Sequence, residues 1–103
     1  MKYPKEYLDE IKTRLKVSTV VSKTVNLKKR GKEFVGLSPF KTEKTPSFTV
    51  NDEKGFYHCF STAEHGNIFD FIMQTQNLKF GEAVKHLANL AGMQPYTFSK
   101  KDE

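Results

Sequence analysis

The sequence has few cysteines that could form disulfides and no long apolar run that could cross a membrane. It has a single cysteine, Cys59, and no tryptophan. One cysteine excludes an intrachain disulfide and fits a protein of the reducing cytosol. No apolar run approaches the length that crosses a bilayer, and charged residues such as Lys2, Lys5 and Asp9 interrupt any signal-peptide pattern. We therefore expect a cytoplasmic protein with no membrane partner.

Basic and phenylalanine residues are plentiful instead. Lysine and arginine number 17 against 12 acidic residues, which gives a net charge of +5 at pH 7. A small basic domain tends to bind polyanions, although charge alone does not separate such a domain from one that is merely basic. The 103 residues fit one compact domain, and nine phenylalanines supply large buried area from a short chain.

Apolar residues at helical spacing predict helices at both ends of the chain. Pro4 suits the first turn of the first helix, and Ser18 is a candidate N-cap for a short second one. A third helix is expected after Gly66, and Gly92 ends a fourth. The apolar positions that define the first and fourth helices are Tyr7, Leu8, Ile11 and Leu15, then Phe80, Ala83, Val84, Leu87, Ala88 and Ala91.

Between these helices the sequence predicts short strands. They cover residues 33–37, 47–50 and 56–60, with 28–32 as a basic turn and 51–55 as the turn of a hairpin. The expected fold class is α+β, a small antiparallel β-sheet, as a hairpin or three-stranded meander, flanked by N-terminal and C-terminal helices. Residues 1–96 are expected to form the domain. The charged residues 97–103 are expected to form a tail or the start of a linker.

Two stretches of this middle segment carry a specific pattern. They read LSPFKTEKTPSFTV over residues 37–50 and KGFYHCFSTAEHGNIFDF over residues 54–71. With the separation between them, they resemble the N-terminal zinc-ribbon, template-binding domain of the bacterial DNA primases, over nearly the whole chain. The resemblance implies recognition of single-stranded DNA template in support of RNA primer synthesis during replication in the bacterial cytoplasm. It also implies two protein partners, the polymerase domain of the primase and the replicative helicase.

The four zinc-ligand positions of that family are mostly replaced here. The family holds zinc with Cys-x-x-His before the hairpin and Cys-x-x-Cys after it. Ser38, Lys41, Cys59 and Thr62 stand at these positions, so only Cys59 keeps a ligand. Hydroxyl groups are poor zinc ligands, and Lys41 would place a cation beside the ion. We expect that the zinc is lost and that phenylalanine packing, with hydrogen bonds among Ser38, Lys41 and Thr62, replaces it.

The resemblance also implies a DNA-binding surface of basic and aromatic side chains. Aromatic rings stack on bases, and lysine or arginine neutralises phosphates. If Phe48 and Val50 face the core, Ser47 and Thr49 face outward, while Tyr57 and His58 offer groups on alternate faces. The candidate residues are Lys29, Arg30, Lys32, Lys44, Thr45, Ser47, Lys54, Tyr57 and His58.

Other interpretations remain open at this point. Catalysis is not expected in this chain, because its acids form no cluster of the kind that holds two metal ions in a polymerase. The chain is alternatively a protein-interaction module that lost DNA contact with its zinc, or a redox or metal sensor that uses Cys59. His58 and Cys59 are strand neighbours, so they point to opposite faces and disfavour a rebuilt metal site. The basic run 28–32 is alternatively a solvated turn, and Lys44 a partner of Glu43 or Asp52.

Overall fold

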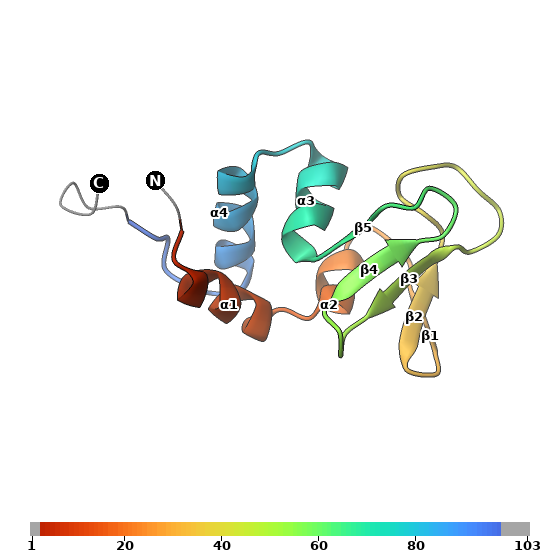
Figure 1. Ribbon diagram of the computed structural model, residues 1–103, viewed down its shortest axis with the longest axis horizontal. Helices are drawn as coiled ribbons and strands as arrows, with labels where there is room; N and C mark the ends of the chain where they lie inside the picture. The colour runs from red at the N-terminus through yellow and green to blue at the C-terminus, as the bar shows by residue number, and fades with distance from the viewer. Residues whose placement is uncertain (1–2, 98–103) are drawn as a thin grey trace.

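A computed structural model describes residues 3–97 of the chain, so most of the charged segment predicted over 97–103 lies outside the described residues. The chain folds with an antiparallel sheet at one end, helices α1 and α4 at the other, and α2 and α3 between them (Figure 1). Described helices and strands follow one another as α1 Lys5–Arg14, α2 Val17–Val21, β1 Lys28–Arg30, β2 Glu33–Gly36, β3 Phe48–Asn51, β4 Phe56–Cys59, β5 His65–Gly66, α3 Ile68–Gln76 and α4 Phe80–Leu90.

The sheet has five strands in the order β1-β2-β3-β4-β5, each antiparallel to its neighbours. This confirms the predicted α+β class and the predicted hairpin, but the sheet is larger than the expected three strands. The prediction of a basic turn over 28–32 is wrong in part, because Lys28–Arg30 pairs with β2. Only the tip turns, where Gly31 adopts a φ of 64°. His65, expected in a turn, belongs to the short strand β5.

The pairing register gives the sheet two different faces. Cross-strand partners point to the same side of a sheet, and successive residues alternate. Phe48, Val50, Tyr57 and Cys59 are all buried and define the core face. The opposite side, called here the outer face, carries one row of partners across all five strands. That row consists of Lys28, Val35, Thr49, His58 and His65.

Helices cover the core face, and phenylalanine rings fill the space between. Phe48 stacks on Tyr57 with ring centroids 5.4 Å apart, and Phe71 of α3 meets Tyr57 edge-on at 5.5 Å. Ile11 from α1 and Leu87 from α4 are fully buried in the same core. Most phenylalanines near the sheet thus serve packing. Among the described residues no helix combines the length and hydropathy that a membrane crossing requires.

The sheet and the helices are also joined by hydrogen bonds at helix ends. Helix α2 has Lys16, not Ser18, at its N-cap, so the capping prediction is wrong. Ser18 instead donates its backbone N–H to the Asp52 carboxylate at 2.8 Å, and its hydroxyl donates to the same group. Asp52 therefore ties the β3–β4 turn to α2. Gly92, with φ of 73°, follows the end of α4 as predicted.

Candidate nucleic-acid interface

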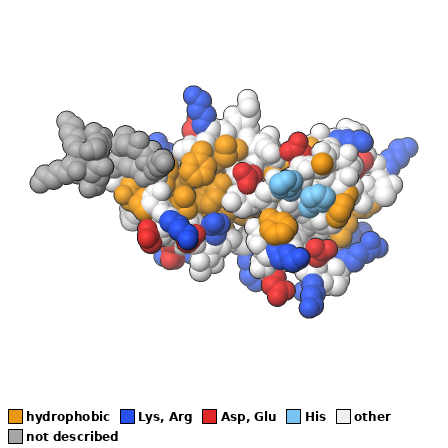
Figure 2. All heavy atoms as spheres, viewed as in Figure 1, with side chains coloured by type: hydrophobic (Ala, Val, Ile, Leu, Met, Phe, Trp, Pro, Cys, Tyr) orange, Lys and Arg blue, Asp and Glu red, His pale blue; other side chains and the backbone are white. Residues whose placement is uncertain are grey.

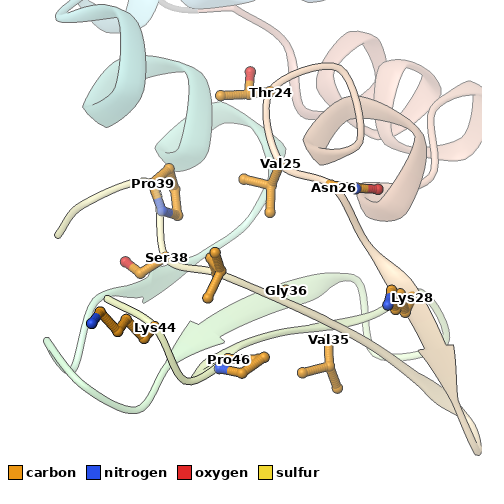
Figure 3. Close-up of a pocket in the computed structure, with 11 residues that line it drawn as sticks. Thr24, Val25, Asn26, Lys28, Val35, Gly36, Ser38, Pro39, Lys44 and Pro46 are labelled. Carbon is orange, nitrogen blue, oxygen red and sulfur yellow. The ribbon is translucent and has the colours of Figure 1, made fainter. Parts of the chain in front are cut away.

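A basic groove lies at the β1 edge of the sheet, between β1 and the loop that joins β2 to β3. Its larger part has a volume of about 620 Å³, with Lys44 toward one end, Lys28 toward the other, and Val35 and Pro46 between them (Figure 3). An adjoining hollow of about 510 Å³ shares Lys28, Val35 and Pro46. We call the two together the basic groove. The adjoining hollow adds Lys29, Arg30 and Thr45 to its walls.

The groove depends on a close approach of two backbone segments. A side chain at Gly36 would meet the Asn26 carbonyl oxygen and the Val25 side chain, each at 2.9 Å. Such contacts are too short for a real Cβ, so glycine is needed where the chain before β1 crosses β2. Gly36 is buried at this crossing and lines the larger hollow together with Val25 and Asn26.

An aromatic stripe runs along the outer side of β4. Phe56 and Phe60 are 43% and 69% exposed, and half-buried His58 lies between them. The His58 ring meets Phe60 edge-on at 4.3 Å and faces His65 at 6.2 Å. Figure 2 shows two histidines side by side on this face, with hydrophobic side chains around them. Phe56, His58 and Phe60 are called the aromatic stripe.

Sequence reasoning selected the wrong aromatic residue of this strand. Tyr57 is fully buried, and its hydroxyl donates to Gln74. Burial, with a smaller contribution from the acids Asp70 and Glu64, raises the pKa of Tyr57 well above its usual value. The prediction that Tyr57 offers a ring to DNA is therefore wrong. Phe56 and Phe60 were missed, although alternation from the buried Cys59 would have placed both on the outer face.

The other predicted residues fall into two groups. Arg30, Lys32, Lys44, Thr45 and Lys54 are exposed, and His58 lies in the aromatic stripe. The other two, Lys29 and Ser47, do not face solvent on the outer face.

Lys29 is exposed, but its ammonium lies over the Phe34 ring at 5.9 Å, on the core side of β1. Lys28, one residue earlier, is the lysine that shares the outer row. Ser47 is half-buried, and its hydroxyl donates to Glu43 rather than facing solvent. Thr49 does face outward and donates its hydroxyl to the His58 carbonyl oxygen at 3.1 Å.

Hydroxyl groups surround Cys59, which stands at one of the positions expected from the sequence to hold a zinc ligand. The Cys59 sulfur lies 3.2 Å from the Ser38 hydroxyl and 3.3 Å from that of Ser61. Burial disfavours the thiolate, but hydrogen bonding with Ser38, Ser61 and Thr62 outweighs this effect and lowers the pKa of Cys59 to about 6. We call Ser38, Ser47, Cys59, Ser61 and Thr62 the hydroxyl cluster.

Glu43 closes this cluster from the loop side. Its carboxylate accepts the backbone N–H groups of Ser38 and Ser47 at 3.0 and 3.1 Å. These bonds, led by the one from Ser38, lower the pKa of Glu43. The carboxylate thus holds the two ends of the loop together. Lys41, expected in the cluster, is exposed and forms no bond to it among residues 3–97.

The donor set does not fit a structural zinc ion. Such an ion takes four ligands, usually thiolates and imidazoles. Across the described part of the chain, no three His, Cys, Asp or Glu side chains are placed to hold a metal. His58 and His65 lie on the outer face, whereas Cys59 lies on the core face, as alternation predicts. Cys59 is also fully buried, which keeps its sulfur from a soluble partner and disfavours a thiol sensor.

The sequence of this chain is similar to one protein family and to several known proteins. Residues 3–103 match the CHC2 zinc finger family. The DNA primase of Haemophilus influenzae is 43% identical over 94 residues, which cover 90% of this chain and 16% of that protein. The DNA primase of Lactococcus lactis is 42% identical over 88 residues, covering 85% of this chain and 14% of that protein. The chain thus spans a small part of the length of these relatives.

A solved structure shows the same fold. The crystal structure of the Aquifex aeolicus primase, which contains zinc binding and RNA polymerase domains, superposes with a TM-score of 0.81 and 28% identity. The match covers 93% of this chain and 24% of that one. The family match spans residues 3–103 and the structural match covers 93% of the chain, so this chain belongs to the CHC2 zinc finger family.

Proposed function

We propose that this chain is the N-terminal domain of a bacterial DNA primase and that it recognises single-stranded template DNA. The parent protein would synthesise RNA primers for DNA replication, with its polymerase domain and the replicative helicase as partners. Residues 1–96 would form the recognition domain, and 97–103 the start of a linker. Support comes from relatives named DNA primase and from a structural neighbour that joins a zinc binding domain to an RNA polymerase domain.

One observation carries the proposal: the aromatic stripe shares one face of the sheet with Lys28 and Val35, two residues that line the basic groove. The row His58, Thr49, Val35 and Lys28 links them across four strands. A stacked base gains about 1–3 kcal/mol on an aromatic ring, and lysines neutralise the phosphates that follow it. Neighbouring strands are about 4.8 Å apart, so this row spans roughly 14 Å. A single strand would cross the sheet from rings to cations.

We further infer that the chain holds this face in place without zinc. The support is chemical, because the four expected ligand positions hold one thiol, two hydroxyls and a lysine. The neighbours of the thiol are the hydroxyls of Ser38 and Ser61, and the Glu43 carboxylate binds the backbone N–H of Ser38. Glu43 bridges residues 38 and 47 by backbone N–H bonds, as a metal would bridge its ligands. The fold would then carry the DNA-binding loop without a cofactor.

The proposal is tested by titrating the chain with single-stranded DNA at two salt concentrations. Phe60→Ala and Lys44→Ala are expected to weaken binding, and binding by the wild type should fall steeply with salt. Lys85→Ala is the matched control, because Lys85 is an exposed lysine on α4, away from the outer face. The absence of wild-type binding at low salt would contradict DNA recognition and favour a protein-docking module.

A further inference from the structure

A second hollow lies at the other end of the aromatic stripe from the basic groove. Its volume is about 480 Å³, and its walls come from α1, from the β3–β4 turn and from the junction of β5 with α3. We call it the junction pocket. It is lined by Lys12, Lys54, Gly55, Phe56, His65, Gly66, Asn67 and Asp70. Pockets that hold small ligands are about 300–1,000 Å³, so a nucleotide fits its size.

Two ammonium groups from distant parts of the sequence line this pocket. Within residues 3–97, Lys12 pairs only with exposed Asp9, at 3.6 Å, and exposed pairs of this kind contribute little. Lys54 is exposed and forms no ion pair with another described residue. Both charges are therefore available to an anion.

Asp70 is the one acid among the described residues that line the pocket, and its carboxylate already accepts a hydrogen bond. The Asp70 carboxylate accepts the backbone N–H of Asn67 at 2.9 Å, as part of the capping box of α3. A Cβ at Gly66 would come within 2.5 Å of Asp70, so this wall is closed tightly. A phosphate would consequently bind on the lysine side of the pocket, away from Asp70.

Phe56 belongs to both the junction pocket and the aromatic stripe. It is 43% exposed, so part of its side chain is accessible to a ligand in the pocket. Side chains two residues apart on a strand are about 6.6 Å apart, and the stripe therefore extends roughly 13 Å from Phe60 to Phe56. A strand that follows the stripe from Phe60 arrives at this pocket.

We propose that the junction pocket holds one nucleotide of the bound single strand, with its base against Phe56 and its phosphate between Lys12 and Lys54. The inference rests on the proposed function and extends it, because Lys12, on the first helix, becomes part of the DNA-binding surface. The bound strand would run from the basic groove across the stripe to the junction pocket.

The test measures binding of a fluorescent twelve-nucleotide deoxythymidine oligomer to the whole chain over a series of salt concentrations. Lys12→Gln, Lys54→Gln and the double variant are compared with Lys85→Gln, an exposed lysine on α4. Phe56→Leu removes the ring but keeps apolar volume, and circular dichroism checks that each variant folds. Removal of a pocket lysine that neutralises one phosphate should reduce the magnitude of the slope of log K against log salt by about 0.7.

The expected result is weaker binding and a smaller salt slope for Lys12→Gln and Lys54→Gln, an additive loss in the double variant, and no change for Lys85→Gln. Phe56→Leu should weaken binding without changing the slope. Pocket variants that behave like Lys85→Gln, while Phe60→Ala still weakens binding, would overturn the junction pocket and leave the proposed function intact. A wild type that binds no oligomer at any salt would overturn both.

Discussion

Cys59 is the one cysteine among the four positions that were expected to hold zinc ligands, and its surroundings give its thiol an unusual pKa. Its buried thiol donates to the Ser38 hydroxyl at 3.2 Å and lies 3.3 Å from the Ser61 hydroxyl, and hydrogen bonding with these groups lowers the pKa of Cys59 to about 6. In an unfolded chain those partners are absent and the thiol keeps its ordinary pKa. Folding is therefore coupled to the proton of a single cysteine.

This coupling predicts a pH-dependent stability. The folded pKa of Cys59 is about 6 and the ordinary value is 9.0, so the thiolate adds stability that is complete above pH 9 and disappears as pH falls through 6. Between these values, the free energy of unfolding of the wild type should rise relative to Cys59→Ala by up to about 1.4 kcal/mol per pH unit. Urea unfolding of both proteins at several pH values measures the difference. A constant difference would contradict a thiolate.

Glu43 gives a second prediction at the residue scale. Glu43→Gln keeps the shape of the side chain but removes the charge that accepts the N–H groups of residues 38 and 47. We expect a lower melting temperature than for the wild type and than for Glu53→Gln, which changes an exposed acid in the β3–β4 turn. Because the pKa of Glu43 is lowered on folding, this contribution is present above the ordinary carboxyl pKa and is lost in acid. Equal melting temperatures at neutral pH would show that Glu43 does not hold the loop.

At the scale of the elements, sequence patterns located the helices better than the sheet. The apolar spacing around Ile11 and Leu87 marks helix faces that are fully buried in the structure. Strand β1 was missed because Lys28–Arg30 is exposed along its whole length, so no apolar alternation marks it. Strand β5 has two residues, which is too short for any pattern. Pairing with a neighbour, rather than local propensity, creates both strands.

The link between the β3–β4 turn and α2 gives a prediction at this scale. Asp52→Ala removes the acceptor for both the N–H and the hydroxyl of Ser18. A lost helix-capping interaction costs about 1–2 kcal/mol, so we expect a loss of that size in the free energy of unfolding. Chemical denaturation measures it, with Glu53→Ala as the neighbouring exposed control. A loss no larger than that of the control would show that α2 is held by packing alone.

At the scale of the whole molecule, the family and the fold class followed from the sequence, whereas the candidate interface followed only in part. Both sides of β4 carry aromatic residues, so alternation places Tyr57 on the core face only when Cys59 is taken as buried. Helix α3 decides it, because Phe71 packs against Tyr57. No sequence pattern pointed to Lys12, because it lines the junction pocket only through the folding of α1 beside the β3–β4 turn.

The whole fold also predicts how the protein responds to metal removal. A structural zinc ion in a small finger contributes apparent folding free energy of about 10–16 kcal/mol, so a chelator unfolds such a domain. Here hydrogen bonds of the hydroxyl cluster and a continuous aromatic core span the same region. We expect the melting temperature to be the same with and without a strong chelator. A large drop would show that a metal is bound after all.

The burial of Cys59 inside the hydroxyl cluster affects how the fold responds to oxidants. Oxidation of metal-binding thiolates releases the ion, and the fold that depends on it is lost. Peroxide cannot easily reach the fully buried Cys59, and no second thiol is available for a disulfide within the chain. A domain built this way is expected to keep its shape through oxidative stress and zinc starvation alike.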